Sequence, residues 1–237
     1  MAGTAAVFFD VDFTLIHPGP KFQGSGYGES CARHGVTVDP ARFEAAVAGA
    51  AAVLDFADAR YDPELYLAYT RRIVELMGGT GPAVGVIARE IYDEWAKHHH
   101  FALYDDVLAT MDELKAKGIR LGIISNSHRC LTSFNAHFDL DEFVSVAISS
   151  PVQGYLKPHP NIFKAALTAM DVPADSAVMV GDSLMHDVMG ARGVGMRGVL
   201  LARGGVHGTV DPDIPVIKSL RELSNILWQP QTSNSEL

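Results

Sequence analysis

Two aspartates two positions apart, Asp10 and Asp12, lie at the end of a short apolar segment near the N-terminus, and Thr14 follows them. The apolar segment, Ala5–Val11, is rich in strand-forming residues, and side chains two apart along a strand point to the same side. Two carboxylates held side by side suit metal binding, nucleophilic attack or proton transfer. The pair could also do no more than cap the strand and solvate the turn. A motif this short leaves both interpretations open.

Two more polar groups follow apolar segments in the same way. Ser125 and Asn126 come directly after Ile119–Ile124. A serine hydroxyl there can bind a phosphate oxygen, although Ser-Asn is also common in turns. Lys157 opens the segment KPHP, whose prolines restrict the backbone. A lysine in such a turn can neutralise phosphate or carboxylate charge, and an ordinary surface lysine is the alternative.

A second pair of carboxylates, Asp182 and Asp187, follows the apolar segment Ala177–Val180. Gly181, directly before Asp182, permits close approach of the backbone. Hard oxygen ligands at a strand end suit Mg²⁺, which takes few protein carboxylates and keeps several waters. Asp187, near the start of a helix, could instead only favour the helix dipole. The two aspartates are therefore candidate metal ligands.

Strand-like and helix-like segments alternate from about Asp105 onward. The expected helices are Asp105–Lys117, Leu131–Phe138, a segment with Ile162, Ala166 and Met170 on one face, and Leu184–Arg192; the expected strands are Ile119–Ile124, Val144–Ser149, Ala177–Val180 and Gly198–Leu201. This alternation predicts parallel βαβ units in an α/β fold: a three-layer core with a Rossmann-like parallel sheet. All the polar groups above would then meet at the carboxyl edge of that sheet, where α/β proteins bind ligands.

The interval from His17 to His100 interrupts that alternation, with helix signals and no convincing strand. Asp39-Pro40 and Asp62-Pro63 are helix starts, and stripes of apolar residues follow each of them. We predict an α-helical module at residues 17–100, inserted into a core of residues 1–16 and 101–228. The polar tail, residues 229–237, is expected to be disordered.

Composition narrows the class of protein. The net charge is −9 and no cluster of basic residues occurs, which argues against a nucleic-acid partner. No apolar stretch approaches the ~20 residues that span a bilayer. The two cysteines, Cys31 and Cys130, lie far apart and are expected to be free, buried thiols. With no secretion signal at the N-terminus, we expect a cytoplasmic protein without a membrane partner, as a monomer or homodimer.

In order and spacing, the four groups resemble the haloacid dehalogenase superfamily, in its phosphatase-like branch, over about residues 4–17 and 101–218. The insert matches the position of that family's helical cap. The resemblance implies these roles: Asp10 as nucleophile; Asp12 as general acid/base; Thr14 as support for the nucleophile loop; Ser125 and Asn126 as phosphate-binding residues; Lys157 as the cation that steadies nucleophile and phosphate; and Asp10, Asp12 (through its carbonyl), Asp182 and Asp187 as the Mg²⁺ site.

The resemblance implies a magnesium-dependent phosphatase that hydrolyses a small phosphorylated metabolite through an aspartyl-phosphate. A haloacid dehalogenase needs no metal, so Asp12 together with Asp182 counts against it. A phosphomutase would need a second phosphate clamp, which the insert does not show. A non-catalytic phosphate-binding module is the remaining alternative. One departure concerns Phe13, where the family usually has a small or polar residue; this puts the size of the substrate in doubt.

Overall fold

The computed structural model describes residues 3–54, 60–205 and 208–228 of the 237-residue chain, so the predicted tail at 229–237 lies outside it. Six parallel strands form the main sheet, in the order β5-β4-β1-β6-β7-β8. Their bounds are β1 Ala6–Phe9, β4 Arg120–Ser125, β5 Val144–Ser149, β6 Ala177–Gly181, β7 Arg197–Leu201 and β8 Val216–Ile217. Every predicted core strand is present, and β8 is an addition at the edge.

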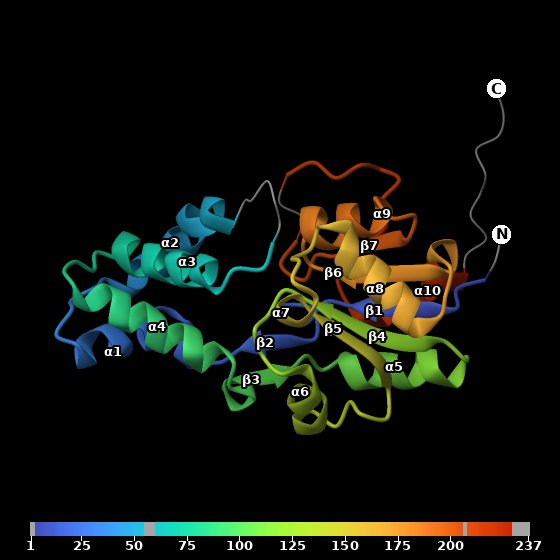
Figure 1. Ribbon diagram of the computed structural model, residues 1–237, viewed down its shortest axis with the longest axis horizontal. Coiled ribbons are helices and arrows are strands. Elements are labelled where there is room, and N and C mark those ends of the chain that lie inside the picture. The colour runs from blue at the N-terminus through green and yellow to red at the C-terminus, as the bar shows by residue number, and fades with distance from the viewer. Residues whose placement is uncertain (1–2, 55–59, 206–207, 229–237) are drawn as a thin grey trace.

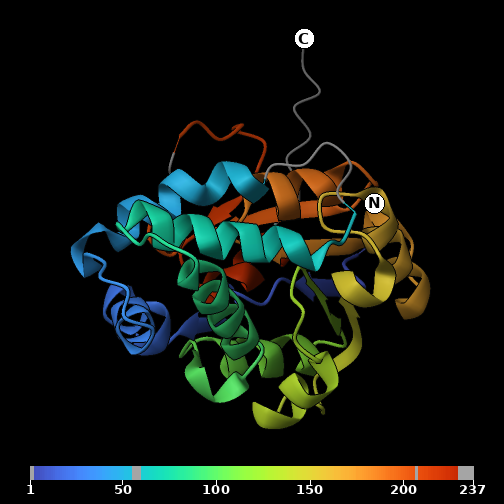
Figure 2. The same ribbon diagram turned by 60° about the vertical axis from the view of Figure 1, so that its left-hand side comes forward.

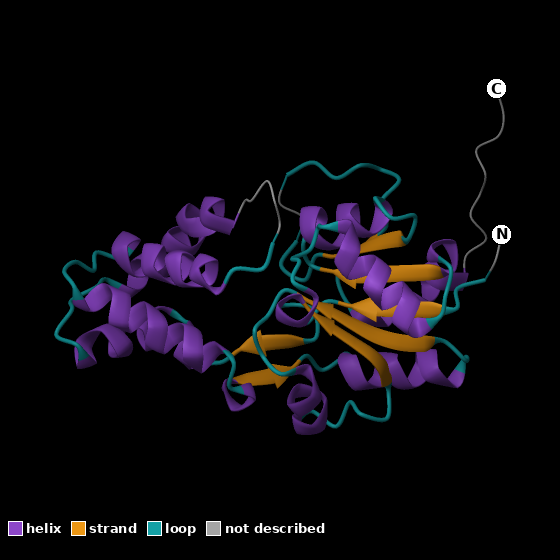
Figure 3. Ribbon diagram, viewed as in Figure 1, coloured by secondary structure: helices purple, strands orange, loops and turns teal. Residues whose placement is uncertain are grey.

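Helices cover both faces of the sheet (Figures 1 and 3). One face carries α5 Val107–Ala116, α6 Leu131–His137 and α10 Leu223–Trp228. The other face carries α8 Pro160–Met170 and α9 Gly190–Arg192, and a π-helical turn at Leu184–Met189 leads into α9. The short helix α7 Ser150–Gln153 follows β5. In β1, Val7 and Phe9 face the first group of helices, and Ala6 and Phe8 face the second. All four side chains are fully buried, which explains the continuous apolar run in the sequence. The three-layer α/β prediction is confirmed.

Among the described residues, four α-helices are inserted between β1 and the rest of the core: α1 Gly24–Arg33, α2 Phe43–Ala50, α3 Pro63–Leu76 and α4 Ala83–Trp95. We call α1–α4 the inserted helical group; it stands at the carboxyl edge of the sheet, at the left of Figure 1 and in front in Figure 2. Asp39 and Asp62 accept hydrogen bonds from backbone N–H groups two residues on, as their position before proline indicates.

Helix α1 is absent from the sequence-based prediction because its glycines conceal it. A Cβ on Gly24 would lie 2.2 Å from the carbonyl oxygen of Pro40, and one on Gly26 would lie 2.2 Å from that of Lys21. The glycines therefore allow α1 to pack against neighbouring backbone. No local signal distinguishes this use of glycine from a loop.

A short two-stranded ribbon joins the inserted helical group to the core. β2 Ile16–Pro18 pairs in antiparallel fashion with β3 Phe101–Leu103. The expectation of no strand in the insert is therefore wrong at His17 and Pro18. A three-residue strand is too short for a period-two pattern, and it forms because the two chain segments meet in space.

Both cysteines are free, as predicted, but only Cys31 is buried and Cys130 is exposed. Within the described residues, the helices are too short or too polar to cross a membrane.

Candidate active site

The polar residues singled out above gather at the carboxyl edge of the sheet. Asp10 follows β1, Ser125 ends β4, and Asp182 follows β6. A cleft of about 970 Å³ lies between this edge and the inserted helical group, and the side chains of Asp10, Asp12, Lys157, Asp182 and Asp187 line it. Segments far apart in the chain meet here because parallel strands end at the same edge.

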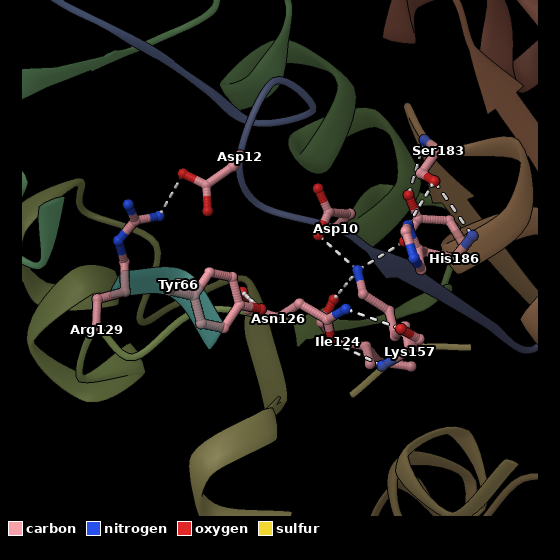
Figure 4. Close-up of polar contacts among 10 residues, drawn as sticks. Asp10, Asp12, Tyr66, Ile124, Asn126, Arg129, Lys157, Ser183 and His186 are labelled. Carbon is pink, nitrogen blue, oxygen red and sulfur yellow. Dashed lines mark hydrogen bonds and ion pairs between the residues drawn. The ribbon is translucent and has the colours of Figure 1, made fainter. Parts of the chain in front are cut away.

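Lys157 lies at the centre of the site, with its side chain only 2% exposed. Its Nζ donates to Asp10 Oδ1 at 2.6 Å, to Asp187 Oδ1 at 2.6 Å and to the Ile124 carbonyl oxygen at 2.9 Å (Figure 4). The three donors of the ammonium group are therefore all used. The surface-lysine alternative is thereby excluded, and Asp187 does more than favour a helix dipole.

Burial and the charges of the site shift the pKa values of Lys157 and Asp10. Burial alone would lower the pKa of Lys157, but Asp10 and Asp187 outweigh it and raise that pKa. Burial raises the pKa of Asp10, the charge of Lys157 opposes this, and the charge of Asp187 adds to it. The site thus holds more buried negative charge than its lysine can neutralise.

Asp182 completes a cluster of three carboxylates. One oxygen each of Asp10, Asp182 and Asp187 lies within 4.8 Å of the others. Asp182 is exposed as a residue, but its carboxylate faces the cleft. Burial there, followed by the charges of Asp10 and Asp187, raises its pKa to about 8. Three oxygen donors with uncompensated charge fit a hard divalent cation such as Mg²⁺.

The turn after β6 depends on glycine. A Cβ on Gly181 would lie 2.2 Å from the carboxylate of Asp187. Asp187 Oδ2 accepts a hydrogen bond from the backbone N–H of Ser183 at 3.0 Å, which holds the carboxylate over the turn while its other oxygen binds Lys157. Gly181 is therefore the residue that lets Asp187 reach the site.

Asp12 points away from this cluster toward Arg129, a residue that sequence reasoning missed (Figure 4). Arg129 Nη1 donates to Asp12 Oδ1 at 2.8 Å, and Nη2 donates to the carbonyl oxygen of Trp95 at the end of α4 at 3.2 Å. The arginine side chain is fully buried, with its guanidinium 4.7 Å from the centre of the Phe101 ring. Burial raises the pKa of Asp12, and Arg129 opposes that shift. An arginine in a polar loop carries no pattern that would predict this role, since arginines are usually exposed.

Asn126 holds the lysine loop in place through its side chain. Asn126 Oδ1 accepts from the Lys157 N–H at 2.7 Å, and Nδ2 donates to the Lys157 carbonyl oxygen at 3.0 Å. Its own carbonyl oxygen accepts from the hydroxyl of Tyr66 in α3 at 2.9 Å. Asn126 thus connects the lysine, the core and the inserted helical group.

Ser125 and Thr14 are both buried, and neither is among the residues that line the cleft. Within the described part of the chain, neither hydroxyl has a hydrogen-bond partner. The Thr14 carbonyl oxygen accepts from Arg203 at 2.9 Å, so the threonine lies behind the nucleophile loop. The phosphate-binding role of Ser125 and the role of Thr14 in supporting the nucleophile loop, next to the substrate, stay predictions.

Phe13 adopts the left-handed backbone conformation, with φ of +62°, which costs most residues about 1–2 kcal/mol. Its N–H donates to the Ile16 carbonyl oxygen at 2.8 Å, which closes the turn between β1 and β2. The ring is 45% exposed at the wall of the cleft. Phe13 therefore faces the pocket and does not pack beneath the helices.

Comparisons with known proteins agree with one another. A family model described as haloacid dehalogenase-like hydrolase matches residues 4–195. A glyceraldehyde 3-phosphate phosphatase of Pyrococcus abyssi is 31% identical over 238 residues, covering 98% of this chain and 97% of that protein. The crystal structure of a HAD phosphatase from Thermococcus onnurineus is similar with a TM-score of 0.65 and 26% identity, covering 94% and 97% of the two chains. The HAD-hydrolase YfnB of Bacillus subtilis, whose structure is described as bound to magnesium, shares the fold with a TM-score of 0.76 at 17% identity, covering 96% and 100%.

Proposed function

This chain belongs to the haloacid dehalogenase-like hydrolase family, and we propose that it is a magnesium-dependent phosphatase that hydrolyses a small phosphorylated metabolite through an aspartyl-phosphate. The observation that carries the proposal is the placement of Lys157 between Asp10 and Asp187, with Asp182 in the same cluster. A nucleophilic carboxylate, a buried cation and a set of oxygen ligands are what phosphoryl transfer requires.

Asp10, Asp182 and Asp187 would hold the Mg²⁺ ion, together with the backbone carbonyl of Asp12 that the family resemblance implies. Bound Mg²⁺ supplies positive charge for the phosphoryl oxygens and lowers the repulsion between phosphate and carboxylates. The donor set consists of oxygens alone, as this ion prefers.

In the first step, Asp10 attacks phosphorus in line with the ester oxygen, and the bond from phosphorus to that oxygen breaks. Lys157 donates to Asp10 and keeps the nucleophile oriented, and its charge opposes the rise that burial causes in the pKa of Asp10. Asp12 gives its proton to the departing oxygen, so the alcohol leaves neutral. In the second step, Asp12 takes a proton from water, which attacks phosphorus and frees Asp10. The inserted helical group, as a lid over the cleft, would exclude bulk water during both steps.

The alternatives on the same fold receive less support. A dehalogenase needs no metal, so that activity would leave the clustering of Asp10, Asp182 and Asp187 unexplained. A phosphomutase needs a second cationic clamp, and among the described residues lining the cleft Lys157 is the sole lysine or arginine.

The test is phosphate release from a panel of phosphate esters, with and without Mg²⁺, followed by acid-quench trapping of the phosphoenzyme. We expect turnover to stop in excess chelator and to return with added Mg²⁺. Asp10→Asn should abolish both turnover and the trapped phosphoenzyme, whereas Asp112→Asn, an exposed aspartate of α5, should leave both unchanged. Full turnover in chelator, or a phosphoenzyme formed without Asp10, would contradict the proposal.

A further inference from the structure

The part of the cleft within the inserted helical group is walled mainly by rings and aliphatic side chains. Its side chains include Tyr27, Phe43, Val47, Tyr69 and Ile73. The rings of Tyr27 and Phe43 lie 4.9 Å apart and tilted, an arrangement that aromatic pairs favour. The wall therefore offers ring surface to a ligand above the phosphate site.

Among the residues that the structure describes, this wall carries no lysine or arginine. Among the described residues that line the cleft, the inserted helical group contributes one charged side chain, and that is Glu44. Positions 55–59, outside the described residues, contain neither lysine nor arginine. A carboxylate or second phosphate on the substrate would lose its hydration here, lie near Glu44 and find no cationic partner. The chemistry of the wall disfavours acidic substrates.

Two phenol hydroxyl groups are among the polar groups of the wall. Tyr27 and Tyr69 both line the cleft, and within the described part of the chain neither hydroxyl has a hydrogen-bond partner. Burial raises the pKa of both phenols, so they remain protonated donors at neutral pH. They can bind carbonyl or ring-nitrogen acceptors of an uncharged ligand.

The size of the cleft favours a substrate of more than a few atoms. Its volume of about 970 Å³ lies at the upper end of the roughly 300–1,000 Å³ typical of small-molecule sites. A three-carbon phosphate would leave most of the ring-lined wall uncovered. Exposed Phe13 at the cleft wall adds one more aromatic surface.

We infer that the preferred substrate is the phosphate monoester of an uncharged alcohol that carries a planar ring. The inference rests on the proposed phosphatase activity and concerns the part of the substrate beyond the phosphate. The ring lies against the wall formed by Tyr27, Phe43 and Tyr69. The phosphate lies at Asp10 and Lys157.

The experiment compares kcat/KM, in the presence of Mg²⁺, for four esters: ethyl phosphate, phosphoglycolate, 2-phenylethyl phosphate and uridine 5′-monophosphate. We expect at least one ring-bearing ester to exceed ethyl phosphate by tenfold or more, mostly through a lower KM, and phosphoglycolate to fall below ethyl phosphate. 2-Phenylethyl phosphate offers an apolar ring, whereas the uracil ring of uridine 5′-monophosphate can also accept hydrogen bonds from the tyrosine hydroxyls. Comparing the two esters shows which kind of ring the wall prefers. If ethyl phosphate or phosphoglycolate matches both ring-bearing esters, the inference is overturned. If none of the four releases phosphate, the proposed activity itself fails.

Two variants test the wall directly. Val47→Lys places a cation in it and should raise kcat/KM for phosphoglycolate, relative to 2-phenylethyl phosphate, at least tenfold. Val86→Lys makes the same change on the 57%-exposed outer surface of α4, away from the cleft, and should leave that ratio unchanged. Tyr69→Phe keeps the ring, so it should weaken only the uridine ester. An unaltered substrate ratio in a folded Val47→Lys protein would overturn the inference, and the wild-type comparison decides the question should that variant fail to fold.

Discussion

Arg129 is the residue whose replacement tests the proposed role of Asp12 most sharply. Arg129→Met keeps a long, apolar side chain between Phe101 and the core but removes the cation that binds Asp12. It also removes the donor to the Trp95 carbonyl at the end of α4. Asp12 would lose the contact that sets its orientation, while Asp10 and Lys157 keep theirs.

Two magnitudes follow from the geometry. Removing one partner of a buried ion pair typically costs about 3–5 kcal/mol of stability. The Asp12 side chain stays 22% exposed, so we expect a loss near the lower end, about 3 kcal/mol. General acid catalysis contributes roughly 10²–10⁴-fold, and a misplaced Asp12 should lose about 10²-fold of it.

The assay compares an alkyl phosphate, which needs a proton on its leaving oxygen, with nitrophenyl phosphate, which hardly does. Arg129→Met should slow phosphoenzyme formation from the alkyl ester about 10²-fold more than from the nitrophenyl ester, as Asp12→Ala should. Arg129→Lys should recover part of the loss. Arg120→Met, at an arginine that binds the Met170 carbonyl oxygen away from the cleft, serves as the control.

Equal slowing with both esters would show that Arg129 supports the fold and has no part in placing the acid. Additive effects of Arg129→Met and Asp12→Ala in a double-mutant cycle would refute the coupling, because residues that act through one another are not additive. Urea denaturation of each variant separates loss of catalysis from loss of folded protein.

Three further predictions concern the carboxylate cluster. Lys157→Met should abolish phosphate release and destabilise the fold by about 3–5 kcal/mol in urea denaturation, because Asp10 and Asp187 lose their shared cation; retention of a tenth of the activity would contradict this. Because burial and its neighbours raise the pKa of Asp182 to about 8, its carboxylate in the metal-free protein is protonated below that pH, and calorimetry should find Mg²⁺ affinity falling about tenfold per pH unit below 8. A constant Mg²⁺ affinity between pH 6 and 8 would refute the raised pKa of Asp182. The same proton stabilises the metal-free fold: this contribution to the free energy of unfolding is complete below the unfolded pKa near 3.8, decreases as the pH rises, and is lost above pH 8. Gly181→Ala should displace Asp187 and lower kcat at least tenfold, whereas Gly85→Ala, at an open position within α4, should leave activity unchanged and raise the melting temperature; equal activity of the two variants would show that Asp187 need not be held so closely.

The local sequence was sufficient to predict most helices and strands of the core, because the residues of each such element show its type by their own pattern. Strand β1 is an unbroken apolar run because both of its faces are covered, and Asp39 and Asp62 mark helix starts because they bind the first N–H groups of their own helices. The order of polar residues after successive strands was also sufficient to predict one shared edge. These features depend on neighbours in the chain, so the sequence alone reveals them.

Tertiary structure decided the elements and contacts that depend on distant neighbours. Helix α1 is hidden because its glycines serve packing against Pro40 and Lys21, and β2 forms only because β3, more than eighty residues later, lies beside it. The ion pair between Arg129 and Asp12 spans 117 positions, and no residue near Arg129 in sequence indicates it. The sequence therefore determined which side chains stand at the edge of the sheet. The fold decided which of them touch, because a contact between distant residues is set by packing and burial, and neither is encoded by the neighbours of a residue in the chain.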